Sequence, residues 1–132
     1  MTYRILVPID ANKERTVEQT DYVRSLPMDR DEVEVKVIHV DEADYEGAPP
    51  REFEDIPSAT TAVEEIADAG FRCEGEKLEG LVAQTILEAA ESFDADEIVV
   101  AGRKRSGVAE VVMGSVTSDV LRSTDRAVVI VG

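Results

Sequence analysis

The sequence predicts an α/β protein with an open, doubly wound, five-stranded parallel sheet that carries helices on both faces. Five strand-like segments alternate with four helix-like segments along the 132 residues. Strands separated by helices imply a mostly parallel sheet covered on both sides, and right-handed crossovers leave few other topologies. The length suits one domain, residues 1–132, around one buried core.

The first half of the chain supplies two strands, one helix and a long loop. We expect a strand at residues 3–9, a helix at 13–26, a strand at 32–40 and a surface loop at 41–57. The first strand is an apolar run closed by Asp10, and the helix carries Val17 and Val23 before Pro27 stops it. The second strand alternates valine with charged residues, whereas the loop holds three prolines and a glycine.

The second half alternates helix and strand three times. We expect a helix from Thr60 or Thr61 to Gly70, a strand at 71–78, a helix at 81–93, a strand at 97–101, a helix at 115–123 and a strand at 127–131. Glu64 stands at capping-box spacing from Thr61, and Val82 and Ile86 share one face of the third helix. The strand at 71–78 is more polar than the others, which favours a place near the sheet edge.

The charge is strongly negative. There are 29 acidic and 14 basic residues, which gives a net charge of −15 with the acids spread along the whole chain. Such a surface repels nucleic acid and anionic membranes, so we expect neither as a partner. Self-repulsion destabilises the compact state unless salt screens it. We interpret the composition as halophilic, typical of a protein in a very salty cytoplasm.

Other features narrow the class of protein. No apolar run approaches the length of a membrane span, and the N-terminus has no basic-then-apolar signal pattern, so a cytoplasmic location is expected. The single cysteine, Cys73, excludes an intrachain disulfide and a cysteine-rich metal site. The Gly-x-Gly-x-x-Gly dinucleotide fingerprint is absent.

The carboxyl ends of the predicted strands direct attention to residues 8–10, 39–41 and 101–114. Gly102 and Gly107 bracket three successive cations, and Gly114 and Ser115 open the last helix. Glycines and a helix N-terminus suit an anion, because backbone N–H groups can approach it closely. A flexible loop with solvated charges and an ordinary serine cap is the alternative, and the spacing leaves both open.

Two further polar residues end strands at the same edge. Asp10 either accepts hydrogen bonds from a ribose or an adenine amino group, or caps the following helix. His39 is the sole histidine, and no serine or cysteine nucleophile accompanies it, so a structural role is favoured over a catalytic base.

Six segments stand out along the chain: RILVPID at 4–10, VIHV at 37–40, ADEIVVAG at 95–102, SG at 106–107, MGSV at 113–116 and DRAVVIV at 125–131. Together they resemble the universal stress protein family over nearly the whole chain. The resemblance implies a Rossmann-like fold of the adenine nucleotide alpha hydrolase type and a homodimer joined through the last strands. It also implies a regulatory or stress-response module in which ATP or AMP, with Mg if ATP, lies over the strand ends.

Carried over by position, the resemblance implies nucleotide-binding residues throughout this edge. They are Pro8, Asp10, Val40, Gly102, Lys104, Gly107, Gly114, Ser115 and Val116. Pro8 and Val40 would line the base pocket, Asp10 would meet the adenine or ribose side, and the glycines and Ser115 would hold the phosphates.

The chain departs from the pattern of ATP-binding members at one point. Lys104 stands where the middle glycine of their loop belongs, and the distance from Gly102 to Gly114 is one residue short. Lys104 either blocks close approach of a phosphate or neutralises it as a point charge. The alternative to a nucleotide-binding module is therefore a dimeric interaction protein of the same fold that binds no ATP. An enzyme is not expected, beyond slow ATP hydrolysis at most.

Overall fold

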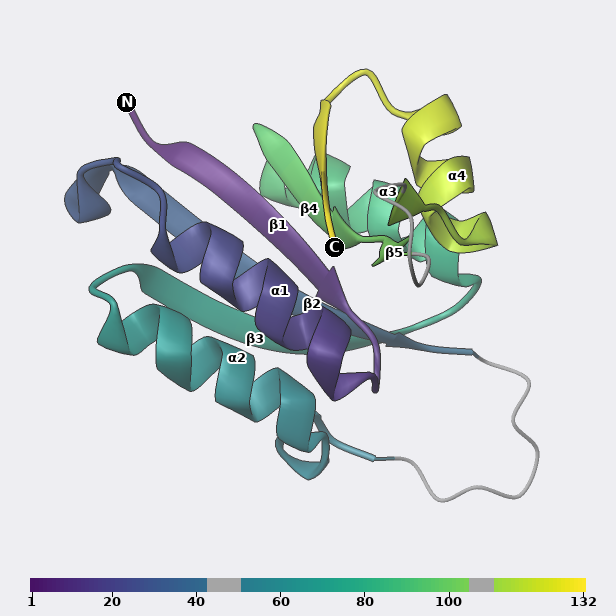
Figure 1. The fold of residues 1–132 in the computed structure, drawn as a ribbon, viewed down its shortest axis with the longest axis horizontal. Coiled ribbons are helices and arrows are strands. Elements are labelled where there is room, and N and C mark those ends of the chain that lie inside the picture. The colour runs from purple at the N-terminus through teal and green to yellow at the C-terminus, as the bar shows by residue number, and fades with distance from the viewer. Residues whose placement is uncertain (43–50, 105–110) are drawn as a thin grey trace.

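The computed structural model describes residues 1–42, 51–104 and 111–132. These parts form a five-stranded sheet in the order β3-β2-β1-β4-β7 and a separate two-stranded sheet, β5-β6 (Figure 1). Every neighbouring pair in the five-stranded sheet is parallel. The predicted fold class is therefore confirmed, with β3 at one edge and β7 at the other.

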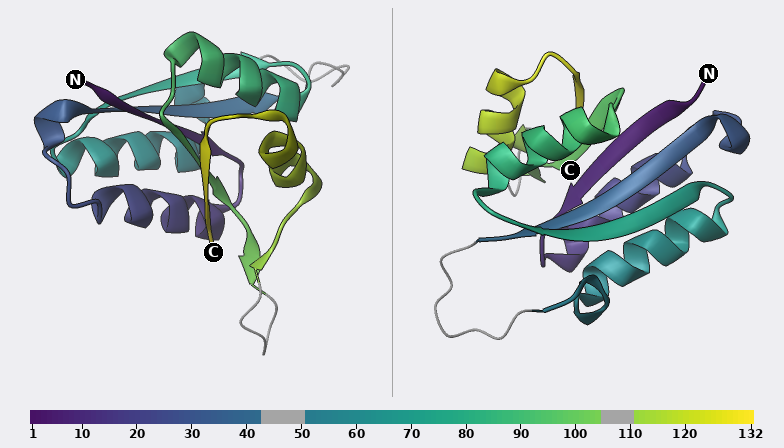
Figure 2. Two further views of the ribbon diagram at one scale, coloured as in Figure 1. Left: turned by 90° about the horizontal axis from the view of Figure 1, so that it is seen from above. Right: turned by 180° about the vertical axis from the view of Figure 1, so that it is seen from behind.

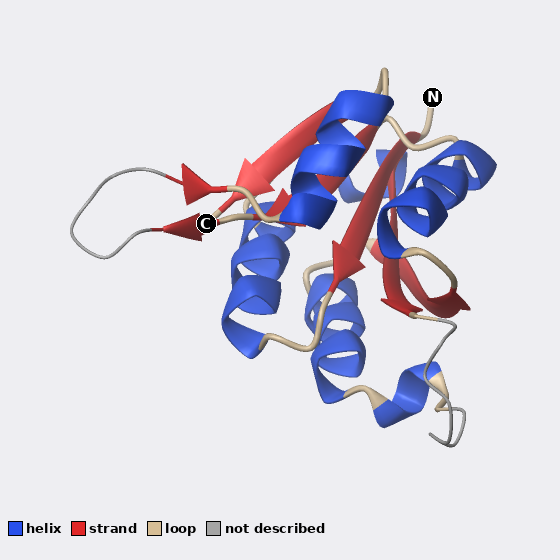
Figure 3. Cartoon of the chain, turned by 90° about the vertical axis from the view of Figure 1, so that its right-hand side faces the viewer, coloured by secondary structure: helices blue, strands red, loops and turns tan. Residues whose placement is uncertain are grey.

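The elements lie close to their predicted places. The strands of the main sheet are β1 (Tyr3–Ile9), β2 (Val33–Asp41), β3 (Arg72–Glu79), β4 (Glu97–Ala101) and β7 (Ala127–Val131). The helices are α1 (Lys13–Arg24), α2 (Pro57–Asp68), α3 (Val82–Phe93) and α4 (Ser115–Ser123). Single 3₁₀ turns, Arg30–Glu32 and Phe53–Asp55, precede β2 and α2. The short strands β5 (Arg103–Lys104) and β6 (Val111–Val112) pair antiparallel and stand apart from the main sheet (Figure 3).

Two cores lie on opposite faces of the sheet. Helices α1 and α2 cover one face and α3 and α4 the other (Figure 2). Successive strand residues point to opposite faces, so Ile5 and Val7 enter the first core while Leu6 enters the second. A strand buried on both faces must be apolar at nearly every position, which is why β1 and β4 read as continuous apolar runs.

The buried face of α1 is more polar than predicted. Thr16, Gln19, Thr20 and Val23 are buried, whereas Val17 is 43% exposed. Of the two valines that the sequence analysis named in this helix, only Val23 is therefore buried. Residues on one face of a helix are spaced three or four apart in sequence. The four buried residues follow this spacing, whereas Val17 does not.

Helix α2 begins earlier than predicted. Its first residue is Pro57 and its N-cap is Ile56, so neither Thr60 nor Thr61 caps it. The Thr60 hydroxyl donates instead to the Pro57 carbonyl, at 3.1 Å. Proline is well suited to the first helical position because the N–H that it lacks would have no partner within the helix.

The buried acid Glu97 links elements at the amino ends of β1 and β4. The Glu97 side chain accepts hydrogen bonds from the hydroxyls of Tyr3, at 2.7 Å, and Tyr22, at 3.2 Å. Burial and the adjacent Glu97 carboxylate raise the pKa of both tyrosines, which keeps them protonated as donors. This network joins β1, α1 and the start of β4.

The described parts of the chain contain neither a membrane-spanning helix nor a cluster of metal-ligating side chains. No helix there is long and apolar enough to cross a membrane. The same residues contain no group of three or more histidine, cysteine, aspartate or glutamate side chains arranged to hold a metal ion.

Candidate functional site

The candidate site arises where β1 and β4 separate. β1 stays paired with β2 as far as Ile9 and His39, but its ladder with β4 contains only Ile5–Glu97 and Leu6–Ile98. Pro8 contributes to the separation because it has no N–H to donate to a ladder. The strand order also reverses between β1 and β4, and ligands of open α/β sheets bind in the crevice at such a switch point.

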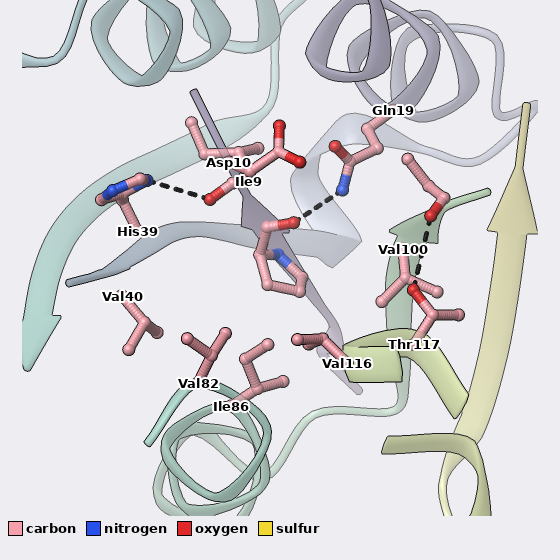
Figure 4. Close-up of a pocket in the computed structure, with 12 residues that line it drawn as sticks. Ile9, Asp10, Gln19, His39, Val40, Val82, Ile86, Val100, Val116 and Thr117 are labelled. Carbon is pink, nitrogen blue, oxygen red and sulfur yellow. Dashed lines mark hydrogen bonds between the residues drawn. The ribbon is translucent and has the colours of Figure 1, made fainter. Parts of the chain in front are cut away.

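A cavity of about 270 Å³ occupies this crevice (Figure 4). Its lining comes from β1, β2, β4 and helices α1, α3 and α4: Pro8, Ile9, Asp10, Gln19, His39, Val40, Val82, Ile86, Val100, Ala101, Val116 and Thr117. Of the sequence-predicted site residues, the structure thus brings Pro8, Asp10, Val40 and Val116 together around one space.

The cavity has an apolar wall and a polar wall. Val40, Val82 and Ile86 form the apolar wall, with Val116 at the start of α4 (Figure 4). Asp10 and Gln19 lie across the cavity from Val82 and Ile86 in the same view. Such a space suits a ligand with a flat apolar part and a hydrogen-bonding part.

Asp10 is held in place by the start of α1. Its carboxylate accepts from the Asn12 backbone N–H, at 2.8 Å, and from Arg15, whose Nη2 lies 2.7 Å from Oδ2. Asn12, and not Asp10, caps α1 by accepting from the Arg15 N–H at 2.9 Å. The capping alternative for Asp10 is therefore wrong, and its half-exposed carboxylate remains at the rim of the cavity.

Gln19 closes the crevice from the α1 side. Its side chain is 2% exposed, and Nε2 donates to the carbonyl of Pro8, at 2.7 Å, and to that of Val99, at 3.0 Å. One amide therefore bridges β1 and β4 beyond the point at which their ladder ends.

His39 is fixed at both ring nitrogens. Nδ1 lies 3.0 Å from the Ile9 carbonyl, which only accepts, so Nδ1 carries a proton. Nε2 lies 3.0 Å from both Asp41 Oδ1 and Arg51 Nη2. Hydrogen bonds from Arg51 hold the pKa of Asp41 at about 2, below its ordinary value of 3.8. The ring lines the cavity with neither nitrogen left free to act as a base.

The amino end of α4 reaches the same region. Gly114 is its N-cap without a side-chain hydrogen bond, so Ser115 is the first helical residue and does not cap the helix. Gly114 has an ordinary φ of −73°. A side chain at Gly114 would meet no described atom within 4 Å, so the position opens on free space. The Thr117 hydroxyl donates to the Ala101 carbonyl at 3.4 Å.

The glycine loop is only partly described. The Gly102 N–H donates to the Val131 carbonyl of β7 at 2.6 Å, so this N–H already has a partner within the protein. Lys104 lies in β5 opposite Val111. Gly107 lies outside the described residues.

Sequence reasoning missed the contributions of three helices. Gln19, Thr117 and the pair Val82 and Ile86 all line the cavity without having been predicted as site residues. For Gln19 a signal existed, because a glutamine at the same helical spacing as buried residues needs a polar partner. Cys73 has no comparable role, since burial raises the pKa of its thiol to about 12 and keeps it protonated.

Comparisons with known proteins agree with this fold. The profile of the Universal stress protein family matches residues 1–132. Among solved structures, a universal stress protein from Archaeoglobus fulgidus is 25% identical, with a TM-score of 0.79 and 100% of both chains covered. A structure of the universal stress protein from Archaeoglobus fulgidus in complex with dAMP is 24% identical, with a TM-score of 0.70 and 98% of each chain covered. A universal stress protein in complex with cAMP is 16% identical, with a TM-score of 0.68, covering 98% of this chain and 95% of that one. No curated protein matches the chain.

Proposed function

The chain belongs to the universal stress protein family, and we propose that it is a regulatory or stress-response module that binds an adenine nucleotide, ATP or AMP, without efficient turnover. The observation that carries the proposal is the cavity between β1 and β4, with its apolar wall, its polar wall and the nearby amino end of α4. The dAMP and cAMP complexes of structural neighbours support the same ligand class.

Each part of an adenine nucleotide has a matching part of the site. The base fits against Val40, Val82 and Ile86, where a flat apolar ring is removed from water. The sugar then lies toward Asp10 and Gln19, which offer hydrogen-bond acceptors. The phosphates extend toward Gly114, where the first backbone N–H groups of α4 have no partner within the helix and the positive end of the α4 dipole favours an anion. If the nucleotide is ATP, we propose that Mg²⁺ enters on its phosphates.

We propose binding without efficient hydrolysis, and the contacts of the lining residues support this. His39 makes contacts through both ring nitrogens, so it has no free lone pair with which to activate water. The 12 lining residues include no serine or cysteine, and their one hydroxyl, that of Thr117, donates to the Ala101 carbonyl. The geometry thus supports retention of a nucleotide rather than its consumption.

Titration calorimetry with AMP and ATP tests the proposal. We expect saturable binding by the native chain, and adenine nucleotide in native mass spectra of the purified protein. Val82→Glu puts a carboxylate into the apolar wall and should weaken binding at least about tenfold, because it faces an anionic ligand without a counter-charge. Leu81→Glu is the matched control, since this neighbour is 72% exposed and does not line the cavity.

Absence of binding by the folded native chain would overturn the proposal. It would favour the dimeric interaction protein of the same fold that binds no nucleotide. Equal affinities of the Val82 and Leu81 variants would place the nucleotide outside this cavity.

We also propose that the chain forms a homodimer through β7. This strand is an edge of the sheet, and its residues 128–131 are only half-buried although all are apolar. An apolar edge strand is prone to pair with another chain. Light scattering after size-exclusion chromatography should find a dimer for the native chain and monomers for Val129→Asp, whereas a dimeric variant would refute this interface.

Finally, we propose that the acidic surface is adapted to concentrated salt in a halophile's cytoplasm. The support is the net charge of −15, which salt would screen. Its test is given below among the predictions.

A further inference from the structure

Gln19 has a side-chain orientation that its neighbours fix. Nε2 donates to the carbonyls of Pro8 and Val99, at 2.7 Å and 3.0 Å. Carbonyl oxygens only accept, so rotating the amide by 180° would replace two hydrogen bonds with two contacts between oxygens. Oε1 therefore has one defined position.

This Oε1 is an acceptor that none of the described residues uses. No described residue donates a hydrogen bond to it, although only 2% of the Gln19 surface is exposed. Among the described residues, no fully buried side-chain nitrogen or oxygen lacks a partner. Oε1 must then belong to the small exposed part of Gln19, a residue that lines the cavity. Figure 4 shows Nε2 directed toward the Pro8 carbonyl and the amide oxygen on the side of Asp10, at the polar wall.

A fixed acceptor in a confined space selects ligands by what they can donate. Water satisfies Oε1 in the free protein, and a ligand that expels this water must replace its hydrogen bond. A ligand with a hydroxyl at this point does so, whereas an analogue without it leaves a carbonyl desolvated and unpaired. The Asp10 carboxylate, the second acceptor on the polar wall, strengthens the preference for a donor and disfavours a carbonyl or phosphate there.

We propose that Gln19 is a specificity-determining residue that accepts a hydrogen bond from a ribose hydroxyl and so selects ribonucleotides over deoxyribonucleotides. This inference rests on the proposed function, because it takes the sugar of an adenine nucleotide as the donor. Gln19 joins the crevice at the end of β1, opposite the wall that receives the base, which is where a sugar attached to that base would lie.

The test measures binding of AMP, 2′-deoxy-AMP and 3′-deoxy-AMP to the full chain by titration calorimetry. The native chain should bind one of the deoxy nucleotides about tenfold more weakly than AMP, the usual loss for one buried hydrogen bond. Gln19→Met keeps the length of the side chain but removes Oε1, together with the two hydrogen bonds of Nε2, so overall affinity can fall while the difference between nucleotides should shrink below about twofold. Thr20→Val is the matched control, because Thr20 is equally buried on α1 but does not line the cavity, and it should keep the discrimination.

The outcomes separate this inference from the proposed function. Equal affinities of the native chain for all three nucleotides, or full discrimination by Gln19→Met, overturn the role of Gln19 and leave AMP binding intact. If the native chain binds no AMP, both proposals fail.

A measurement on the native chain covers the case in which Gln19→Met does not fold. The ¹³Cδ resonance of Gln19 should stay near its free-state position with AMP, because the ribose hydroxyl replaces the hydrogen bond from water. It should move upfield with the deoxy nucleotide that binds more weakly, because Oε1 then lacks a donor and the amide carbonyl is less polarised. Identical shifts with all three nucleotides would overturn the inference.

Discussion

Replacing Arg30 by methionine should destabilise the protein strongly, because Arg30 joins the carboxyl ends of two helices. Nη1 donates to the carbonyls of Leu26, at 2.6 Å, and Met28, at 3.0 Å. Nη2 donates to that of Arg24, at 3.1 Å. Helix ends leave carbonyls without partners inside the helix, and Arg30 satisfies that of Arg24, the last residue of α1, together with two carbonyls of the segment that follows.

The same guanidinium also reaches α2 and the start of β3. Nε donates to the carbonyl of Ala69, the C-cap of α2, at 3.3 Å. The guanidinium carbon lies 4.1 Å from the centre of the Phe71 ring, a cation–π contact. Within the described parts of the chain, no other side chain donates to these backbone carbonyls, so Arg30 alone ties α1 to α2 through them.

The magnitude follows from these contacts. A hydrogen bond to a charged donor contributes about 1.5–3 kcal/mol, but Arg30 is only half-buried and water would replace part of what is lost. With the cation–π contact, we expect a loss of about 3 kcal/mol. At an unfolding entropy of about 2 cal/mol/K per residue, this lowers the Tm of a 132-residue chain by about 10 °C.

Thermal unfolding followed by circular dichroism in molar salt checks this value. The matched control is Arg24→Met, which removes the same charge but only an exposed ion pair with Asp21, at 3.7 Å. Such a pair contributes at most about 0.5 kcal/mol, so the control should lower the Tm by about 2 °C or less. Equal losses in the two variants would show that net charge alone, and not capping by Arg30, sets the stability.

Three further predictions follow. The pKa of Asp41 is lowered to about 2, so its contribution is complete above pH 4 and is lost as the pH falls toward 2. After allowance for partial exposure, Asp41→Asn should lower the free energy of unfolding in urea by about 1 kcal/mol at pH 7. The difference between the native chain and the variant should narrow below pH 4, and a constant difference would contradict the lowered pKa of Asp41. The Tm of the native chain should rise from low to molar salt, since screening reduces self-repulsion at net charge −15, and a flat response would remove the halophilic interpretation. Gly114→Val should leave the Tm nearly unchanged, because its φ of −73° suits any residue, yet abolish nucleotide affinity by filling the open space; unchanged affinity would place the phosphates elsewhere.

The strands could be predicted closely because their signal is local. β1, β4 and β7 have the expected bounds, since short apolar runs that end at turn residues are typical of strands buried on both faces. The start of α2 could not be placed as well. Pro57 reads equally as the end of a loop and as the first residue of a helix, and only the packing of Ile56 and Ala59 in the core decides between them.

The site residues at the carboxyl ends of strands could be predicted from the sequence. Those whose role depends on the separation of β1 from β4 could not. Pro8, Asp10 and Val40 follow or end strands whose carboxyl ends share one edge, so the topology alone brings them together. Gln19 and Thr117 lie within helices, and their carbonyl partners Pro8, Val99 and Ala101 become accessible only because β1 and β4 diverge. That divergence is a tertiary property. A buried polar residue on a helix indicates that some partner exists, but not which one.

The two ends of the Gln19 amide link the stability of the fold to recognition of the ligand. Nε2 supplies the two hydrogen bonds that the β1 and β4 carbonyls would otherwise lack, so a glutamine here is required for stability even in a protein that binds nothing. The same two bonds are what fix Oε1 in the cavity. A loss of affinity in a Gln19 variant therefore does not distinguish a structural role from a ligand contact, because a loosened crevice would weaken every nucleotide alike. Only unequal losses between nucleotides that differ by one hydroxyl isolate the contact, since a structural defect lowers all three affinities and preserves their ratios.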